Sequence, residues 1–420
     1  MLYLTATGRN DWASQIAGSP SKSFFYPSVG LSWVPSSTWD LGNAFSYLKL
    51  RGSIASVGLP FPRFLTTPTY EYDATGKIWK DKTHYPIGDL KPERTITYEV
   101  GIDARLWKNI SLSASWYSAD TKNQTFDPAL PPSSSYTTIY LQTGHVRNTG
   151  VELSLGYSNQ WRDFGWSSNF TFSWNKNEIV DLASGALNPV TGQPLNLSEL
   201  DIKGLGKAKY ILKQGGTLGD LYTTSDLKFN DNGYVEVDKA GNLLLTDEGE
   251  QIYLGSVFPS ENLAWRNDFR YKGINLGLLF TGRIGGICYS ATQANMDLYG
   301  VSEVSAAARD AGGVLINGRE MVDAQKWYQA IGSQSGLPQY YTYSATNFRL
   351  QELSLGYTLP RKWFRNKMVL TVSFVGRNLW MIYCKAPFDP EAVASTGLSY
   401  QGIDYFMMPS LRSLGFNVKF

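Results

Sequence analysis

The sequence predicts an all-β fold: the wall of an antiparallel transmembrane β-barrel with about 12 strands. Apolar and polar residues alternate in segments of about ten residues, the period and length of a strand that crosses an outer membrane. In the clearest segments every acidic or basic residue lies on the polar phase. Long and short connections also alternate along the chain, and outer-membrane barrels combine short periplasmic turns with long extracellular loops.

The strands are expected in the following order. Eight segments alternate clearly: Thr95–Leu106, Ile110–Tyr117, Val151–Tyr157, Trp166–Asn175, Leu263–Tyr271, Ile274–Arg283, Met368–Arg377 and Ser413–Phe420. Four are weaker: Leu2–Gly8, Pro27–Val34, Tyr47–Ser56 and Phe348–Leu359. The last of these changes phase between Leu350 and Leu353, which predicts a β-bulge.

The connections set the expected topology of the barrel. The long ones are predicted to be extracellular and cover residues 9–26, 58–95, 120–146, 177–260, 285–345 and 379–408. Two segments within 285–345 have helical character, Ser305–Asp310 and Val322–Ile331. Tryptophans at the short turns, such as Trp107, Trp161 and Trp363, are typical of the aromatic belt at a membrane interface.

Composition excludes several classes of protein. The 420 residues include 38 basic and 36 acidic side chains, and this balance excludes a strongly basic nucleic-acid binder. Apolar residues make up 43%, aromatic residues 14% and charged residues 18%, a bias shared by membrane barrels. No apolar run of about 18 residues exists, so no membrane-spanning helix is expected. The start at Met1 lacks the basic and long apolar regions of a signal peptide, and we expect none.

Several blocks of the sequence resemble the barrel region of SusC/RagA-like TonB-dependent transporters of the Bacteroidota. The blocks occur in the same order as in that family and cover almost the whole chain. They are Tyr3–Trp33, Leu48–Gly58, Leu90–Asp103, Leu130–Tyr136, Val146–Tyr157, Phe348–Pro360, Phe374–Trp380 and Phe388–Ala392.

The resemblance implies a 22-stranded barrel in the outer-membrane lipid, blocked by an N-terminal plug that follows a TonB box. It also implies import of oligosaccharides or peptides together with a SusD-like surface lipoprotein that covers the barrel. Residues 1–420 resemble only the C-terminal part of this barrel. We therefore expect the plug and the TonB box to be absent, and contact with TonB only through the missing N-terminal region.

Aromatic residues in the predicted loops are the candidate contacts to a ligand or to the partner. An aromatic face covers the apolar side of a sugar ring while polar neighbours bind its hydroxyl groups. Packing between loops and contact with the lid lipoprotein are alternative roles. The candidates are Tyr70, Tyr72, Trp79, Tyr136, Tyr140, Trp327, Tyr328, Tyr340 and Tyr341.

No catalytic, cofactor or metal site is predicted, and the chain is not expected to be an enzyme. Its two histidines and two cysteines lie far apart, and no nucleophile motif is present. Acidic and amide residues in 226–250 allow a calcium site, but Asn232-Gly233 and Gly241-Asn242 read more simply as hairpin turns. Cys288 and Cys384 are either a disulfide or two unrelated thiols.

Charged residues on the predicted inner face have two alternative roles, salt bridges to a plug or pairing with one another across strands. These residues are Glu99, Asp103, Arg105, Glu152, Arg266, Asp268, Arg270 and Arg283. Two alternatives to a part of an importer stay open: a complete, passive 12-stranded outer-membrane pore or structural protein, and a soluble carbohydrate-binding β protein.

Overall fold

The computed structural model describes most of the chain. The described residues are 1–16, 19–20, 22–61, 65, 70–81, 84–85, 91–126, 136, 138–183, 186–187, 193–195, 197–246, 249–395, 397 and 400–420.

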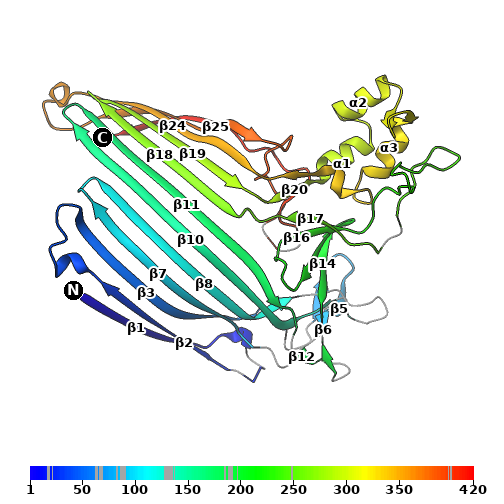
Figure 1. Ribbon diagram of the computed structural model, residues 1–420, viewed down its shortest axis with the longest axis horizontal. Helices are drawn as coiled ribbons and strands as arrows, with labels where there is room; N and C mark the ends of the chain where they lie inside the picture. Colours follow the sequence, from blue (N-terminus) through cyan, green and yellow to red (C-terminus); the bar gives the residue numbers. More distant parts are fainter. Residues whose placement is uncertain are drawn as a thin grey trace.

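One antiparallel sheet of 12 strands dominates these residues and confirms the predicted fold class (Figure 1). Neighbours in the sheet follow one another along the chain, with β1 and β27 at its two edges. The strands are β1 (Leu2–Asp11), β2 (Phe24–Trp33), β3 (Phe45–Leu59), β7 (Glu93–Leu106), β8 (Ile110–Phe126), β10 (Leu141–Trp161), β11 (Phe164–Asp181), β18 (Glu261–Tyr271), β19 (Ile274–Ile284), β24 (Asn347–Thr358), β25 (Thr371–Cys384) and β27 (Ser413–Lys419).

The connections between these strands lie at two opposite rims. The short-turn rim consists of the connections 34–44, 107–109, 162–163, 272–273 and 359–370. The long-loop rim consists of the connections 12–23, 60–92, 127–140, 182–260, 285–346 and 385–412. In Figure 1 both chain ends lie at the short-turn rim, and the helices lie at the other.

Several strands extend beyond their predicted ends on the long-loop side. β8 continues to Phe126 and β10 already begins at Leu141, so the connection between them is shorter than the predicted 120–146. The added residues are mainly polar on both faces; among them is Thr121, whose hydroxyl oxygen lies 2.8 Å from that of Thr95 on β7. Above the apolar band both faces of a strand contact water, so alternation fades while the backbone ladder continues.

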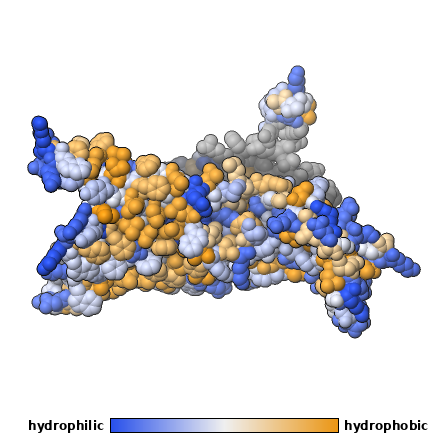
Figure 2. Space-filling model, turned by 90° about the horizontal axis from the view of Figure 1, so that it is seen from above, coloured by the Kyte–Doolittle hydropathy of each residue, from blue (hydrophilic) through white to orange (hydrophobic). Residues whose placement is uncertain are grey.

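The outer face of the sheet carries rows of apolar residues that run across strands. One row joins Val100, Trp116, Val151 and Trp174 on four consecutive strands. Val100, Trp116 and Val151 are exposed to the surroundings of the chain. Figure 2 shows apolar side chains gathered over the strands and strongly polar ones gathered toward the two ends. This is the band that a lipid-facing wall requires, because a Lys or Arg at mid-bilayer costs about 2–4 kcal/mol.

Two polar residues within the apolar phase are hydrogen-bonded by tryptophans. The indole N–H of Trp166 donates to the side-chain oxygen of Asn267 at 3.2 Å. The indole N–H of Trp265 donates to the hydroxyl of Ser168 at 3.0 Å. Such partners remove the cost of leaving a polar group unsatisfied in an apolar environment.

The predicted β-bulge in β24 is confirmed. Leu350 pairs with Phe280, and Glu352 pairs with Leu279, so Gln351 has no partner residue on β19. The extra residue restores the phase, which is why Leu350 and Leu353 face the same side although they are an odd number of positions apart.

The two predicted helical segments are confirmed as α2 (Glu303–Asp310) and α3 (Ala324–Ile331). Their first turns are capped by Ser302 and Asp323, which accept backbone N–H bonds from Ser305 and Lys326. A third helix, α1 (Ala291–Leu298), was not predicted; four of its eight residues are polar. No helix in the described part of the chain is long and apolar enough to cross a bilayer.

The long connections form further short strands. These are β4 (Tyr70–Asp73), β5 (Ile78–Asp81), β6 (His84–Tyr85), β9 (Thr138–Ile139), β12 (Ala186–Leu187), β13 (Pro194–Leu195), β14 (Glu199–Leu205), β15 (Ala208–Lys213), β16 (Asp220–Thr223), β17 (Ile252–Ser256), β20 (Ile287–Ser290), β21 (Val314–Ile316), β22 (Glu320–Val322), β23 (Thr342–Ser344) and β26 (Ile403–Asp404). Short 3₁₀ turns cover Ser14–Ile16, Pro35–Ser37, Pro338–Tyr341 and Arg361–Phe364.

Candidate ligand-facing surface

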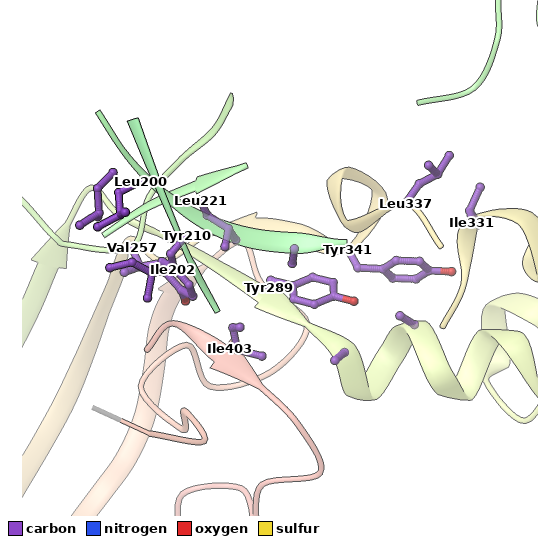
Figure 3. Close-up of a cluster of buried hydrophobic side chains, with 14 of the residues drawn as sticks. Leu200, Ile202, Tyr210, Leu221, Val257, Tyr289, Ile331, Leu337, Tyr341 and Ile403 are labelled. Carbon is purple, nitrogen blue, oxygen red and sulfur yellow. The ribbon is translucent and has the colours of Figure 1, made fainter. Parts of the chain in front are cut away.

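Three long connections of the long-loop rim pack into one body with its own hydrophobic core. This loop core includes fully buried side chains from residues 182–260, 285–346 and 385–412, among them Tyr210, Tyr289, Leu221, Leu337 and Ile403 (Figure 3). The hydroxyl of Tyr210 donates to the backbone carbonyl of Gln401, which ties the first of these connections to the last. Because their apolar residues are buried together, the three connections form a rigid platform over the rim.

A buried ion pair joins the loop core to the barrel wall. The guanidinium of Arg349 on β24 donates to both carboxylate oxygens of Asp389, at 2.8 and 3.1 Å, and only 4% and 7% of the two side chains are exposed. Arg349 also pairs with Glu391 at 3.1 Å, and Glu391 lies 3.5 Å from Arg283 on β19. Burial alone would raise the pKa of Asp389, but bonds from Arg349 and Ser410 outweigh it and hold that pKa below its usual range.

Three of the candidate aromatic residues lie on one hairpin of the long-loop rim. Tyr72 on β4 pairs with Trp79 on β5, and their ring centroids are 5.2 Å apart. Tyr70 lies two positions before Tyr72 and so on the same face. The turn is closed by Asp73, whose carboxylate accepts the N–H groups of Thr75 and Gly76. Half or more of each ring is exposed: 67% of Tyr70, 50% of Tyr72 and 69% of Trp79.

Tyr136 and Tyr140 lie in the connection between β8 and β10. Both are half-buried, and neither belongs to a strand. Tyr140 packs against a small cluster of Ile16, Phe61 and Leu65, which belong to the first two long connections. Its ring therefore has a packing role between these loops.

The remaining four candidates divide into two pairs. Tyr328 and Tyr341 are buried in the loop core, with 6% and 2% of their surface exposed, and burial raises the pKa of both above its usual range. These two rings support the platform, and no ligand can reach them in this structure. Trp327 and Tyr340 lie nearer the surface in an edge-to-face contact with centroids 6.1 Å apart. Burial, with a smaller contribution from Asp226, raises the pKa of Tyr340 to about 12.

Charged residues on the inner face of the wall pair largely with one another. Asp103 lies 3.6 Å from Lys49 and 3.7 Å from Arg51, and Arg51 also binds Glu99. Arg266 pairs with Asp268 at 2.9 Å, and Glu352 lies between Arg266 and Arg377, at 3.4 and 3.1 Å. Pairing across strands, one of the two roles considered above, therefore accounts for Glu99, Asp103 and Arg266, whereas Asp268 pairs within β18. In the described residues Arg105, Glu152 and Arg270 form no ion pair.

A hollow of 360 Å³ lies on this inner face. Eight of its 12 lining residues have hydroxyl, amide or charged side chains, among them Arg51, Ser113, Glu152 and Asn262, and the other four are Leu153, Phe172, Leu263 and Ala264. A polar, hydrated inner surface is what a transport lumen offers to a polar solute.

The acidic segment within 226–250 is a double hairpin. Phe229 pairs with Val235 and Val237 pairs with Leu243, and Gly233 and Gly241 take left-handed φ values of 76° and 78° at the two turns. Asp238 accepts the N–H groups of Ala240 and Asn242. Asp247 and Glu248, two of the residues considered for calcium, lie outside the described residues, and no cluster of three acidic, His or Cys ligands occurs within the described ones.

Both cysteines are free thiols. Cys288 is buried on β20, and burial, with smaller contributions from Cys384 and nearby carboxylates, raises its pKa to about 12. At neutral pH this thiol is therefore protonated and unreactive as a nucleophile.

Sequence reasoning missed the ion network around Arg349. The motif Phe388–Ala392 was noted only for its resemblance, and its acids lie 40 or more residues from Arg349 in the chain. His145 and Arg147, which share Asp120 at 2.7 and 2.9 Å, were missed for the same reason. A charged residue inside a strand, next to a phase change, is the signal that could have indicated Arg349.

Comparison with known proteins identifies the architecture. The family described as "TonB dependent receptor-like, beta-barrel" matches residues 1–256. The chain is 24% identical to TonB-dependent receptor P3 of Formosa agariphila, over 99% of the chain and 44% of that protein. It is 20% identical to TonB-dependent receptor SusC of Bacteroides thetaiotaomicron, over 79% of the chain and 32% of that protein.

The fold is similar to that of solved transporters. The RagAB peptide importer in its closed-closed state superimposes with a TM-score of 0.72 at 20% identity, over 99% of this chain and 45% of that one. Its open-open state gives a TM-score of 0.68 at 18% identity. The chain thus spans less than half the length of these relatives.

Proposed function

Because this chain belongs to the TonB-dependent receptor-like β-barrels, with SusC/RagA-like character, we propose that it forms the C-terminal wall of an outer-membrane importer. The imported solutes are oligosaccharides or peptides, and a SusD-like surface lipoprotein covers the long-loop rim. Energy arrives through TonB and the N-terminal part of the importer. Membership in this family confirms an outer-membrane location and the expectation that the chain is not an enzyme.

The observation that carries the proposal is the exposed aromatic face of the β4–β5 hairpin. Tyr70, Tyr72 and Trp79 present three rings on one surface of the long-loop rim, where long loops of outer-membrane barrels face the exterior. Such a surface suits the apolar face of a sugar ring or an apolar peptide side chain. The polar hollow around Glu152 then offers hydrogen bonds to the same solute along the wall.

Import by cells that carry the intact importer tests this proposal. We expect uptake of labelled oligosaccharides or peptides to require both TonB and a SusD-like lipoprotein. Tyr72→Ala combined with Trp79→Ala should lower uptake at subsaturating solute about tenfold, since each aromatic contact contributes about 0.5–1.5 kcal/mol. The matched control is Tyr299→Ala, which removes a ring that is 75% exposed elsewhere on the same rim.

The outcome also separates the alternatives. A passive pore would admit solute without TonB and in proportion to its external concentration. Loss of uptake in the Tyr299→Ala control, to the same extent as in the hairpin variant, would remove the hairpin from the proposed site.

A further inference from the structure

The turn between β24 and β25 carries an unusual concentration of positive charge. Residues 361–367 contain Arg361, Lys362, Arg365 and Lys367 and no acidic residue. All four side chains are exposed, and none forms an ion pair within the described part of the chain. Arg365 and Asn366 take left-handed φ values of 51° and 61°, which makes the turn tight. We name residues 361–367 the basic turn.

A fifth cation lies beside the basic turn. The N–H of Thr358 donates to the carbonyl of Gly273 at 2.7 Å, so the two neighbouring turns of the short-turn rim are held together. Lys272 lies in the second of these turns, with its ammonium 5.3 Å from the centroid of Tyr271. Its acidic neighbour is Asp163 at 3.9 Å, and both of these side chains are more than 60% exposed. This part of the rim therefore keeps a strong positive excess.

Exposed aromatic rings accompany these cations. Trp363, within the basic turn, is 64% exposed, and Tyr271 and Tyr357 are 48% and 43% exposed. Ile274 on β19 pairs with Tyr271 on β18 and with Tyr357 on β24. The three residues are the outward-facing side chains nearest the short-turn rim on these strands. Tryptophan and tyrosine take this place at a membrane interface, where one part of the ring is in lipid and the other contacts headgroups.

From these contacts we propose that the basic turn binds the phosphate headgroups of anionic phospholipids in the periplasmic leaflet of the outer membrane. The short-turn rim of an outer-membrane barrel faces the periplasm. Arg and Lys bind phosphate through charge-assisted hydrogen bonds, and each cation near an anionic membrane surface contributes about 1 kcal/mol. An exposed indole among the cations, at the edge of the lipid-facing phase, favours a lipid over an acidic protein.

The test uses the intact protein purified from outer membranes and reconstituted in nanodiscs of phosphatidylcholine and phosphatidylglycerol. Preference for phosphatidylglycerol is measured from spin-labelled lipids of both kinds. The test variant combines Arg361→Gln, Lys362→Gln, Arg365→Gln and Lys367→Gln. The matched control combines Lys77→Gln, Lys239→Gln, Arg319→Gln and Lys385→Gln, four exposed cations of the long-loop rim. Heat-modifiable migration shows that each variant is folded.

We expect the wild type and the control to prefer phosphatidylglycerol, and the test variant to lose that preference about tenfold or more. High salt should weaken the preference of the wild type in the same direction. Trp363→Ala, which keeps all four charges, should reduce it by a smaller factor.

Several results would overturn the proposal. One is an unchanged preference in the folded test variant, and another is an equal loss in the control. Full displacement of the lipid by inorganic phosphate would indicate a site for free phosphate. Loss of cross-linking to a periplasmic protein, with lipid preference intact, would indicate a protein partner instead.

Discussion

Arg349 and Asp389 form a two-point ion pair in the interior of the protein, with the guanidinium on the barrel wall and the carboxylate on the last long connection. A pair this well buried is costly to break, since removing one partner leaves an uncompensated charge. Because the Arg349–Asp389 pair joins the last long connection to β24, it holds the loop core in a fixed orientation relative to the barrel wall.

Asp389→Ala should therefore destabilise the protein by about 3–5 kcal/mol and loosen residues 385–412. Urea unfolding in lipid bilayers and limited proteolysis of that connection measure the two effects. Glu178→Gln breaks the exposed Lys176–Glu178 pair, which has a similar separation of 2.7 Å, and should change neither readout. If the two variants behave alike, burial does not set the strength of the Arg349–Asp389 pair.

The same pair predicts how stability depends on acid. The pKa of Asp389 is lower in the folded protein than in the unfolded chain, where the pKa of an Asp is about 3.9. A depressed pKa contributes stability that is fully present above the unfolded value and is lost as pH falls through the folded value. The urea concentration at the unfolding midpoint of the wild type should therefore decrease as the pH is lowered below about 4. The contribution of Asp389 to this decrease should be absent in Asp389→Asn.

Two buried tyrosines in the loop core provide an internally matched comparison. The hydroxyl of Tyr210 bonds to Gln401, whereas that of Tyr289 has no hydrogen-bond partner among the described residues. Tyr210→Phe should cost about 1 kcal/mol, and Tyr289→Phe should be neutral or stabilising. Equilibrium unfolding of both variants, monitored by near-ultraviolet circular dichroism, gives the difference. Equal effects would contradict the assigned hydrogen bonds.

A double-mutant cycle tests the lipid-facing hydrogen bond between Trp166 and Asn267. Trp166→Phe removes the donor and leaves the amide of Asn267 unsatisfied on the apolar phase, at an expected cost of about 1–3 kcal/mol. Adding Asn267→Leu removes that unsatisfied group and should recover part of the loss. Additive effects of the two substitutions in lipid-bilayer unfolding would show that the residues do not interact.

The barrel wall was predictable from the sequence because each strand has lipid on one side and water on the other. Apolar and polar residues must therefore alternate along every strand that crosses the membrane. Residues Thr95–Leu106, for instance, reveal β7 through alternation alone, and the phase change at Leu350 reveals the bulge at Gln351. The polar ends of β8 and β10 were missed because that rule stops at the membrane boundary.

The loop core was much less predictable. β15 is buried on both faces, so its residues do not alternate. Its paired strands, β14 and β16, are near in sequence, but part of the core that buries it, such as Tyr289 and Ile403, lies on other connections. Residue type alone could not separate exposed Trp79 from buried Tyr341, since burial depends on tertiary packing. The distinction between ligand-facing and supporting aromatics therefore required the structure.

The orientation of the two rims in the membrane is the claim on which the proposed function most depends. Intact cells carrying either Lys239→Cys, on the long-loop rim, or Asp163→Cys, on the short-turn rim, can be treated with a maleimide polymer too large to pass through porins. We predict that Lys239→Cys is labelled on intact cells, and that Asp163→Cys is labelled only after the outer membrane is permeabilised. Labelling of Asp163→Cys on intact cells would contradict a lipid-embedded wall with its long connections outside.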